Sequence, residues 1–309
     1  MWPRAVRVIM PIVRPPIAPI VSACVASIAG TSPNPASPRS ARCTTTQAYE
    51  TCRIHRIGRP IVASRNRNWF FIALVAALGA ASIGFTLFSR AALAVGLDLV
   101  LFIIAVMAGR VIPAFTNNAI AGAGARRIRW LEYTALASVL ALLALDPLGL
   151  ETAAALVALV AAVLHGWRIA LWAPLSTRGR PILWILHVSY AWVVVHLALR
   201  GLAGFGLVPA MLATHALTIG AIGGLTIGMM TRTARGHTAR PLEVGRSEVT
   251  AYVLVQAAAI VRVLLPLALP SLYTASVVLS ALLWSAAFAI FTLVYIPILT
   301  RPRLDGQPG

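Results

Sequence analysis

Four histidines of this sequence lie inside long apolar segments, where an ionisable side chain is costly to place. They are His165, His187, His196 and His215. A neutral imidazole is a common ligand of haem iron and of copper, and it can also pass a proton between neighbouring groups. These residues therefore predict a metal centre or a proton path within a membrane. A simpler alternative stays open for each of them, because a single histidine can hydrogen-bond to a neighbouring helix and have no further role.

The positions of the ionisable groups along the chain predict two polar layers. With a rise of about 1.5 Å per residue, His165 and His187 lie at a similar depth toward one side of the membrane. The layer toward the other side holds Asp98, His196, His215 and Arg262. A helical rotation of roughly 180° separates His187 from His196, so the two are expected to belong to different sites.

Three charged residues are expected to have structural roles. Asp98 and Arg262 share one layer, and opposite charges in hydrocarbon compensate each other when they pair. We therefore predict an ion pair between Asp98 and Arg262. Arg168 lies near the end of an apolar segment, from which its long side chain can reach the membrane surface, and this predicts an anchoring role.

A stripe of glycines marks one of the later apolar segments. It contains Gly220, Gly224 and Gly228 at intervals of four residues, with Gly223 beside them. A helix face without side chains lets a neighbouring helix approach closely, and helix packing is the main prediction for this stripe. The alternative is a flat macrocycle that lies against the stripe and is ligated by His215.

The composition requires that most of the chain lie in a membrane. Of 309 residues, 59% are hydrophobic and only 11% are charged, with a mean hydropathy of +0.85. One soluble core of this size cannot bury so much apolar surface. We predict an all-α, polytopic bundle of about eight transmembrane helices, since eight segments approach the ~20 residues needed to cross a bilayer. They cover residues 69–88, 91–108, 128–145, 151–171, 182–199, 207–230, 248–265 and 272–295.

The basic residues predict the orientation of these helices. The net charge of +18 comes from arginine alone, and the arginines cluster between apolar segments, which is typical of topology signals and not of a nucleic-acid surface. With eight spans, most arginines after residue 68 fall in segments on one side, and only Arg90 and Arg200 fall on the other. Because basic loops stay in the cytoplasm, both termini are predicted to be cytoplasmic.

The chain is expected to have three parts. Residues 1–68 are rich in proline and arginine and are predicted to be a disordered basic segment, or not native coding sequence. Residues 69–300 form the transmembrane domain, and residues 301–309 form a cytoplasmic tail. All three cysteines precede residue 53 without a spacing typical of a disulfide or zinc site, and no motif of hydrolases or nucleotide-binding proteins occurs. No residue could be assigned a catalytic role.

Three segments resemble the NnrS family of bacterial membrane proteins. They are HALTIGAIGGLTIGMMTRTARGHTARPL (215–242), GRVIPAFTNNAI (109–120) and LWILHVSYAW (183–192). The resemblance extends over about residues 60 to 300 and places His215, Arg232 and His237 at family positions. Asn117, Arg235 and Ala239 depart from the family pattern, and family members have further amino-terminal spans.

This resemblance implies a multi-pass protein of the bacterial inner membrane that acts in nitric oxide metabolism or in tolerance of nitrosative stress. It implies haem and copper as cofactors, nitric oxide as a ligand and the lipid bilayer as surroundings. Cofactor binding is expected at His187 and His215 with His165 or His196, and metal binding at His187, His215 and His237. Two alternatives remain: a metal-free proton-coupled transporter or channel lined by Asp98, His196, His215 and Arg262, or an incomplete, inactive family member.

Overall fold

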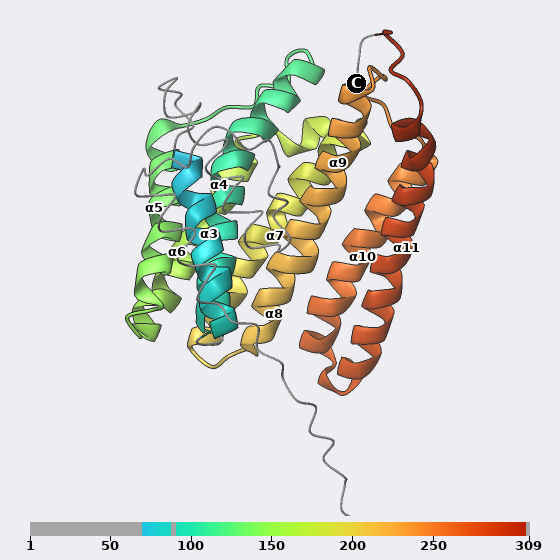
Figure 1. Ribbon diagram of the computed structural model, residues 1–309. Coiled ribbons are helices and arrows are strands. Elements are labelled where there is room, and N and C mark those ends of the chain that lie inside the picture. The colour runs from blue at the N-terminus through green and yellow to red at the C-terminus, as the bar shows by residue number, and fades with distance from the viewer. Residues whose placement is uncertain (1–69, 88–90, 307–309) are drawn as a thin grey trace, which may run out of the picture. The chain divides into compact units, whose positions relative to one another are not determined.

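The computed structural model describes residues 70–87 and 91–306, and within these ranges it contains helices and their connections but no strands (Figure 1). The α-helices are α3 (Phe70–Leu87), α4 (Ala91–Ala119), α5 (Arg129–Leu145), α6 (Glu151–Ala170), α7 (Pro181–Gly204), α8 (Ala210–His215), α9 (Gly224–His237), α10 (Arg246–Ala268) and α11 (Tyr273–Thr300). A π-helix, η2 (Ala216–Gly223), joins α8 to α9 into one continuous rod. The predicted all-α bundle is confirmed, while the predicted segment 1–68 lies outside the described residues.

Six helical segments among the described residues are long and apolar enough to cross a membrane. They are α4, α6, α7, the rod from α8 to α9, α10 and α11. The helix α5, with 17 residues, and α3 are not among the six. The multi-pass character is therefore established, and membrane crossing by the remaining two helices stays a prediction.

The helix α7 occupies the centre of the bundle. It packs against α4, α6, α8, α9 and α10, and side chains all around it are buried. A largely apolar helix suits such a position, because its faces pack against other helices. Polar side chains on α7 are consequently surrounded by other helices, and they supply a large part of the polar sites described below.

Several helices extend beyond their predicted ends. The helix α4 was expected to stop at Ala108, but it continues through Pro113 to Ala119. Neighbouring helices can compensate for a proline in a membrane helix. Here Thr116 lies 3.4 Å from His187 of α7, and Phe115 stacks beneath Arg232 of α9. These tertiary contacts favour helix beyond the point where the local sequence predicts a break.

The glycine stripe is a helix-packing surface. A Cβ atom on Gly220 would overlap the indole ring of Trp192, and one on Gly224 would meet Ser189 and Gln256. Trp192 donates a hydrogen bond of 2.8 Å to Gln256, which in turn donates one of 3.2 Å to Ser189. The side chains of α7 and α10 thus fill the space over the glycines, and the alternative of a macrocycle against this stripe has no support.

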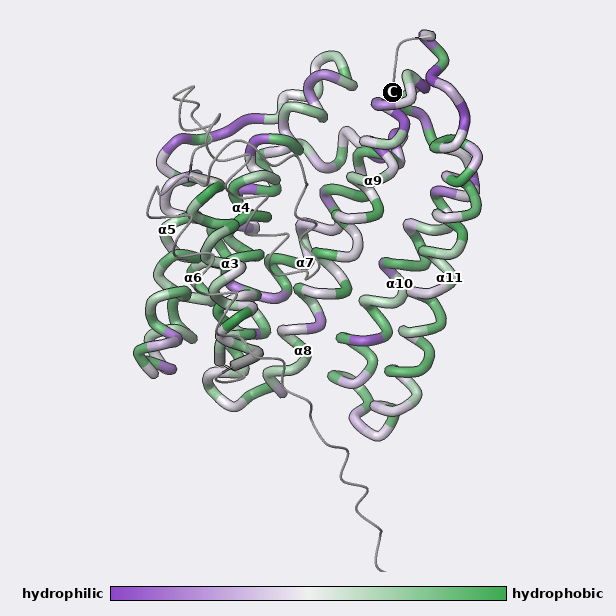
Figure 2. Tube along the Cα trace, viewed as in Figure 1, coloured by the Kyte–Doolittle hydropathy of each residue, from purple (hydrophilic) through white to green (hydrophobic). Residues whose placement is uncertain are grey.

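Hydrophilic stretches gather at the end of the bundle where α9 and α11 end (Figure 2). The segment between α4 and α5, which contains Arg126 and Arg127, lies at this end as well. Arginine-containing connections therefore gather at one end of the bundle, as the predicted topology requires. The cytoplasmic position of this end stays a prediction, as does that of both termini.

Candidate functional site

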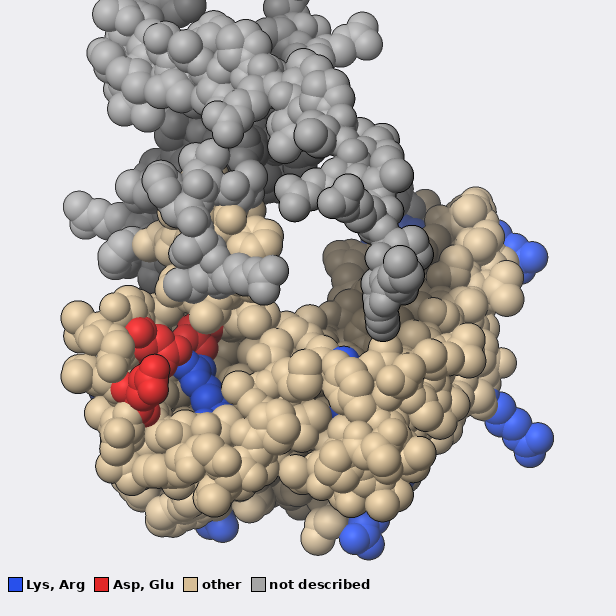
Figure 3. All heavy atoms as spheres, turned by 90° about the horizontal axis from the view of Figure 1, so that it is seen from below, with Lys and Arg blue, Asp and Glu red and all other residues tan. Residues whose placement is uncertain are grey.

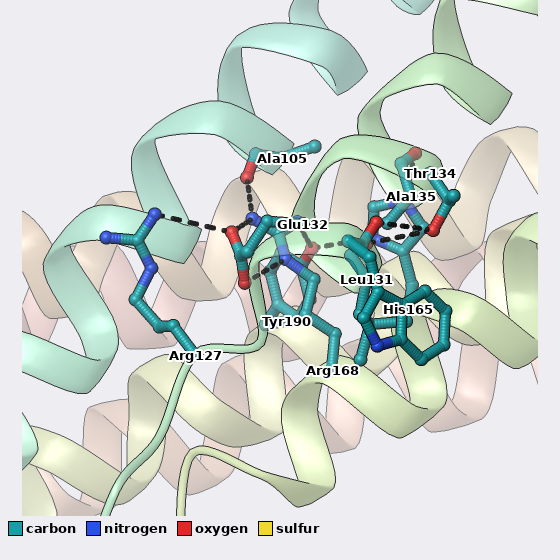
Figure 4. Close-up of polar contacts among 10 residues, drawn as sticks. Ala105, Arg127, Leu131, Glu132, Thr134, Ala135, His165, Arg168 and Tyr190 are labelled. Atoms are coloured by element: carbon teal, nitrogen blue, oxygen red, sulfur yellow. Dashed lines mark hydrogen bonds and ion pairs between the residues drawn. The ribbon is translucent and has the colours of Figure 1, made fainter.

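Arg168 is the centre of a buried polar network between four helices (Figure 4). Its guanidinium donates hydrogen bonds of 2.9 and 2.7 Å to the two carboxylate oxygens of Glu132 on α5. It also donates to the carbonyl of Ala105 on α4 at 2.9 Å and to the hydroxyl of Tyr190 on α7 at 2.8 Å. With only 1% of its surface exposed, Arg168 is not the predicted anchor at the membrane surface. The helix α6 instead directs this side chain into the bundle, where a carboxylate compensates the charge.

His165 completes this network as a neutral imidazole. Its Nε2 lies 3.1 Å from the carbonyl of Ala135, which can only accept a hydrogen bond, so Nε2 carries the proton. Its Nδ1 lies 2.7 Å from the hydroxyl of Tyr190 and accepts a hydrogen bond from it. Both ring nitrogens therefore have partners within the protein, and His165 has no lone pair left for a metal.

Gly109, within the segment GRVIP, lies directly beside this network. A Cβ atom at this position would stand 2.8 Å from both Cζ of Arg168 and a carboxylate oxygen of Glu132. We expect Gly109→Ala to displace the guanidinium and lower the free energy of unfolding by about 1–3 kcal/mol, the usual cost of overpacking. Denaturation in mixed micelles measures this, and Gly79→Ala, where a Cβ atom has open space, is the control. Equal stability of both variants would contradict the prediction.

His187 has different surroundings from His165, although both lie on adjacent helices. Its Nδ1 lies 3.1 Å from the carbonyl of Leu183, and its Nε2 lies 3.3 Å from the carbonyl of Trp172 and 3.4 Å from Oγ1 of Thr116. The two histidines share no hydrogen-bonding partner. For both, the described contacts match the simpler alternative of a histidine bonded to a neighbouring helix or carbonyl.

A polar pocket of about 380 Å³ opens between α4, α6, α7, α8 and the connection from α5 to α6. We define it by its ionisable lining residues, which are Asp98, Asp146, Glu151, His196 and Arg200. On the face seen in Figure 3, acidic side chains surround a basic one at a recess in the surface. Three carboxylates and one guanidinium thus line this pocket.

Asp98 pairs with Arg200, and this corrects the predicted pair of Asp98 with Arg262. Arg200 donates hydrogen bonds of 2.5 and 3.1 Å to the two carboxylate oxygens of Asp98, and it also contacts Asp146. Arg200 was expected in a loop because the helix was predicted to end at Leu199. The helix α7 instead continues to Gly204, so Arg200 lies one turn beyond His196 and reaches the pocket.

His196 lines the polar pocket, and one of its ring nitrogens has no partner among the described residues. Its Nδ1 lies 2.8 Å from the carbonyl of Ala213, so Nδ1 carries the proton and Nε2 presents a lone pair. Nε2 is buried, and residues 70–87 and 91–306 offer it no hydrogen-bond partner. Directly after α8 the chain enters the π-helix η2, a form found frequently at functional sites. The imidazole is therefore held in one orientation with a free acceptor atom.

Burial raises the pKa of the Asp146 carboxyl above its usual value of 3.8, and the charge of Asp98 adds to the shift while Arg200 opposes it. A carboxyl with a raised pKa in the folded protein loses stabilisation as the pH rises from its unfolded pKa through its folded one. We expect stability to decline over that window, and Asp146→Asn to remove this decline, a change of under about 1 kcal/mol at a partly exposed site. Unfolding measured from pH 4 upward tests this; an unchanged pH profile would contradict it.

His215 and Arg262 form a second pair, apart from the polar pocket. Arg262 donates a hydrogen bond of 2.8 Å to Nε2 of His215 and one of 3.2 Å to the hydroxyl of Tyr273. Nε2 of His215 must accept this bond, so that lone pair is occupied. Of the four residues predicted for a transport path, Asp98 and His196 thus meet at the pocket, while His215 and Arg262 meet each other.

The predicted metal ligands His187, His215 and His237 lie in three different surroundings. His237 is the exposed last residue of α9, in a second pocket with Arg232. Among residues 70–87 and 91–306, no three histidine, cysteine or acidic side chains converge to hold a metal ion. Of the buried histidines in these ranges, only His196 has a ring nitrogen without a hydrogen-bond partner.

The structure shows the surroundings of the three residues that depart from the family pattern. The side-chain amide of Asn117 forms two hydrogen bonds, of 2.9 and 3.0 Å, with the backbone of Ala125 and closes the connection after α4. Arg235 pairs with Glu248 at 2.6 Å. Ala239 adopts a φ of +57°, a left-handed conformation that favours glycine.

Sequence reasoning missed Glu132, Tyr190 and Arg200 as members of these sites. Glu132 and Arg168 occur at the ends of neighbouring apolar segments, and opposite charges at one end of adjacent helices are a signal for pairing. Tyr190 lies in the segment LWILHVSYAW, three residues after His187, but only His187 was predicted to belong to a site. The position of Arg200 four residues after His196 is the corresponding signal for the pocket.

The helices and these buried charge networks define a polytopic helical membrane protein. Over residues 41–303 the chain matches the family described as NnrS protein, and it belongs to this family. The match begins at residue 41, nearer the amino terminus than residue 60, where the resemblance was expected to begin. No curated protein and no solved structure matches the chain.

Proposed function

We propose that this membrane protein acts in the handling of nitric oxide or in tolerance of nitrosative stress. The observation behind the proposal is membership of the NnrS family, whose match extends over residues 41–303. The bacterial inner membrane is the proposed location, in agreement with the apolar helices and the clustered arginines.

His196 is the proposed point of cofactor attachment. Histidines that ligate metals usually donate their other ring proton to a carbonyl or carboxylate, and His196 donates to Ala213 in this way. His196 lines a pocket of about 380 Å³, and its buried Nε2 has no hydrogen-bond partner among the described residues. A haem iron or a copper ion bound there would supply reversible ligation of nitric oxide. His196 would hold the group, and the helices around the pocket would limit access of water.

A metal and spectroscopic assay of the full chain tests this proposal. Protein purified in detergent from haem-replete cells is expected to show a Soret band or stoichiometric copper, and the band is expected to shift when nitric oxide is added. His196→Ala should reduce the metal content to background, while His187→Gln should retain it, because His187 is not among the residues that line this pocket. Colourless, copper-free wild-type protein, or full metal content in His196→Ala, would contradict the attachment.

A metal-free, proton-coupled transporter is a second candidate function. It is supported by the meeting of Asp98 and His196 at one pocket, where the lone pair of His196 could accept a proton. In this case Asp98→Asn is expected to abolish a pH-dependent flux in vesicles without changing the metal content. Loss of metal with unchanged flux would favour the first candidate.

A further inference from the structure

A second pocket, of about 350 Å³, lies between α4 and α9. It is lined by Phe115, Met229, Arg232, Thr233, Gly236, His237 and Leu242, and we call it the arginine pocket. Phe115 is about 25 Å along α4 from Asp98 at 1.5 Å per residue, so this pocket is separate from the polar pocket. Two family-like segments meet here, since Phe115 belongs to GRVIPAFTNNAI and the α9 residues belong to the segment that begins at His215.

Arg232 brings a positive charge into this pocket. Its guanidinium carbon lies 3.7 Å from the centre of the Phe115 ring, which holds the planar group in one orientation. Within the part of the chain that the structure describes, Arg232 forms no ion pair and no hydrogen bond. The nearby Arg235 differs, because Glu248 compensates it at 2.6 Å. The donors of Arg232 are therefore available to an anion.

The other lining residues indicate the kind of anion. The exposed side chains of Thr233 and His237 can add hydrogen bonds at the rim. Phe115, Met229 and Leu242 form an apolar wall beside these polar groups. A ligand with a phosphate group and an adjoining hydrocarbon part matches both halves of this lining.

We propose that the arginine pocket binds the phosphate of an anionic lipid, with Arg232 as the principal contact and His237 and Thr233 as secondary contacts. Basic pockets between membrane helices near the bilayer surface are suited to such head groups. The pocket lies at the end of α9, which belongs to an apolar rod long enough to cross a membrane. A free phosphate has the same chemistry, and the experiment separates the two sources.

Lipid binding to the delipidated full chain in detergent tests the proposal, with native mass spectrometry as the readout. Phosphatidylglycerol is expected to bind at least about tenfold more tightly than phosphatidylcholine, because charge-assisted hydrogen bonds to Arg232 favour the anionic head group. Arg232→Gln should remove this preference. The matched control is Arg240→Gln, since Arg240 lies nearby but outside the pocket lining and contacts a backbone carbonyl.

Two further arms make the result decisive. If inorganic phosphate displaces the lipid at equal concentration, the pocket is a site for free phosphate and the lipid proposal is wrong. If phosphate displaces the lipid only weakly, the lipid proposal is supported. Arg232→Lys, which keeps the charge but loses the planar stacking, should bind with intermediate affinity, and melting of each variant without lipid reports on folding. Equal binding of both lipids by the wild type, or an undiminished preference in folded Arg232→Gln or Arg232→Lys, would overturn the proposal.

Discussion

Arg168→Met is expected to lower the free energy of unfolding by about 3–5 kcal/mol, the cost of leaving one partner of a buried ion pair uncompensated. The substitution removes both hydrogen bonds to Glu132, which is itself only 8% exposed. It also leaves the carbonyl of Ala105 and the hydroxyl of Tyr190 without their donor. Four helices lose their common contact, so unfolding in mixed micelles should shift strongly toward lower denaturant concentration.

A double-mutant cycle separates this electrostatic cost from the loss of packing. Glu132→Gln, introduced with Arg168→Met, removes the unpaired charge and should restore about half or more of the lost stability. Arg127→Gln is the matched control: Arg127 lies 3.5 Å from the same carboxylate, but its side chain is 47% exposed. A surface pair of this kind contributes less than about 1 kcal/mol. An equal effect of Arg127→Gln and Arg168→Met would refute the central role of Arg168.

The helices could be predicted from the sequence because the bilayer sets both their length and their composition. The ends of the helices were less predictable. They matter because a charged residue near a helix end can pair with different partners depending on where the helix stops. A predicted end at Leu199 placed Arg200 in a loop and left Asp98 to pair with Arg262. The helix α7 continues by five more residues, to Gly204, and directs Arg200 to Asp98 instead.

The depth of the histidines was also predictable, but their direction around each helix was not. A rise per residue fixes depth, whereas direction depends on how neighbouring helices pack. His165 and His187 were expected to lie at a similar depth, which left their direction around each helix open. In the structure His165 bonds to Tyr190 and Ala135, whereas His187 bonds to other partners. In His196, by contrast, Nε2 has no partner among the described residues, and no sequence pattern reveals this.

Arg200→Met is expected to lower the free energy of unfolding by about 2–4 kcal/mol. Arg200 compensates two carboxylates, Asp98 and Asp146, and so joins α4 and α7 to the connection after α5. Its side chain is 18% exposed, and water at the mouth of the pocket reduces the cost relative to Arg168. Arg178→Gln, at an exposed position, is the control for removal of one positive charge and should change stability by under about 0.5 kcal/mol.

The combination of Arg200→Met with Asp98→Asn distinguishes a structural role of these charges from a functional one. Asp98 is 4% exposed, so its charge is the costlier one to leave unpaired, and its removal should restore about half of the stability lost in Arg200→Met. If the double variant regains stability but not metal binding or pH-dependent flux, the charges have a function in the pocket itself. If it regains stability together with metal binding or flux, the charges only hold the helices together. No recovery of stability would show that Asp98 is not the group that Arg200 compensates.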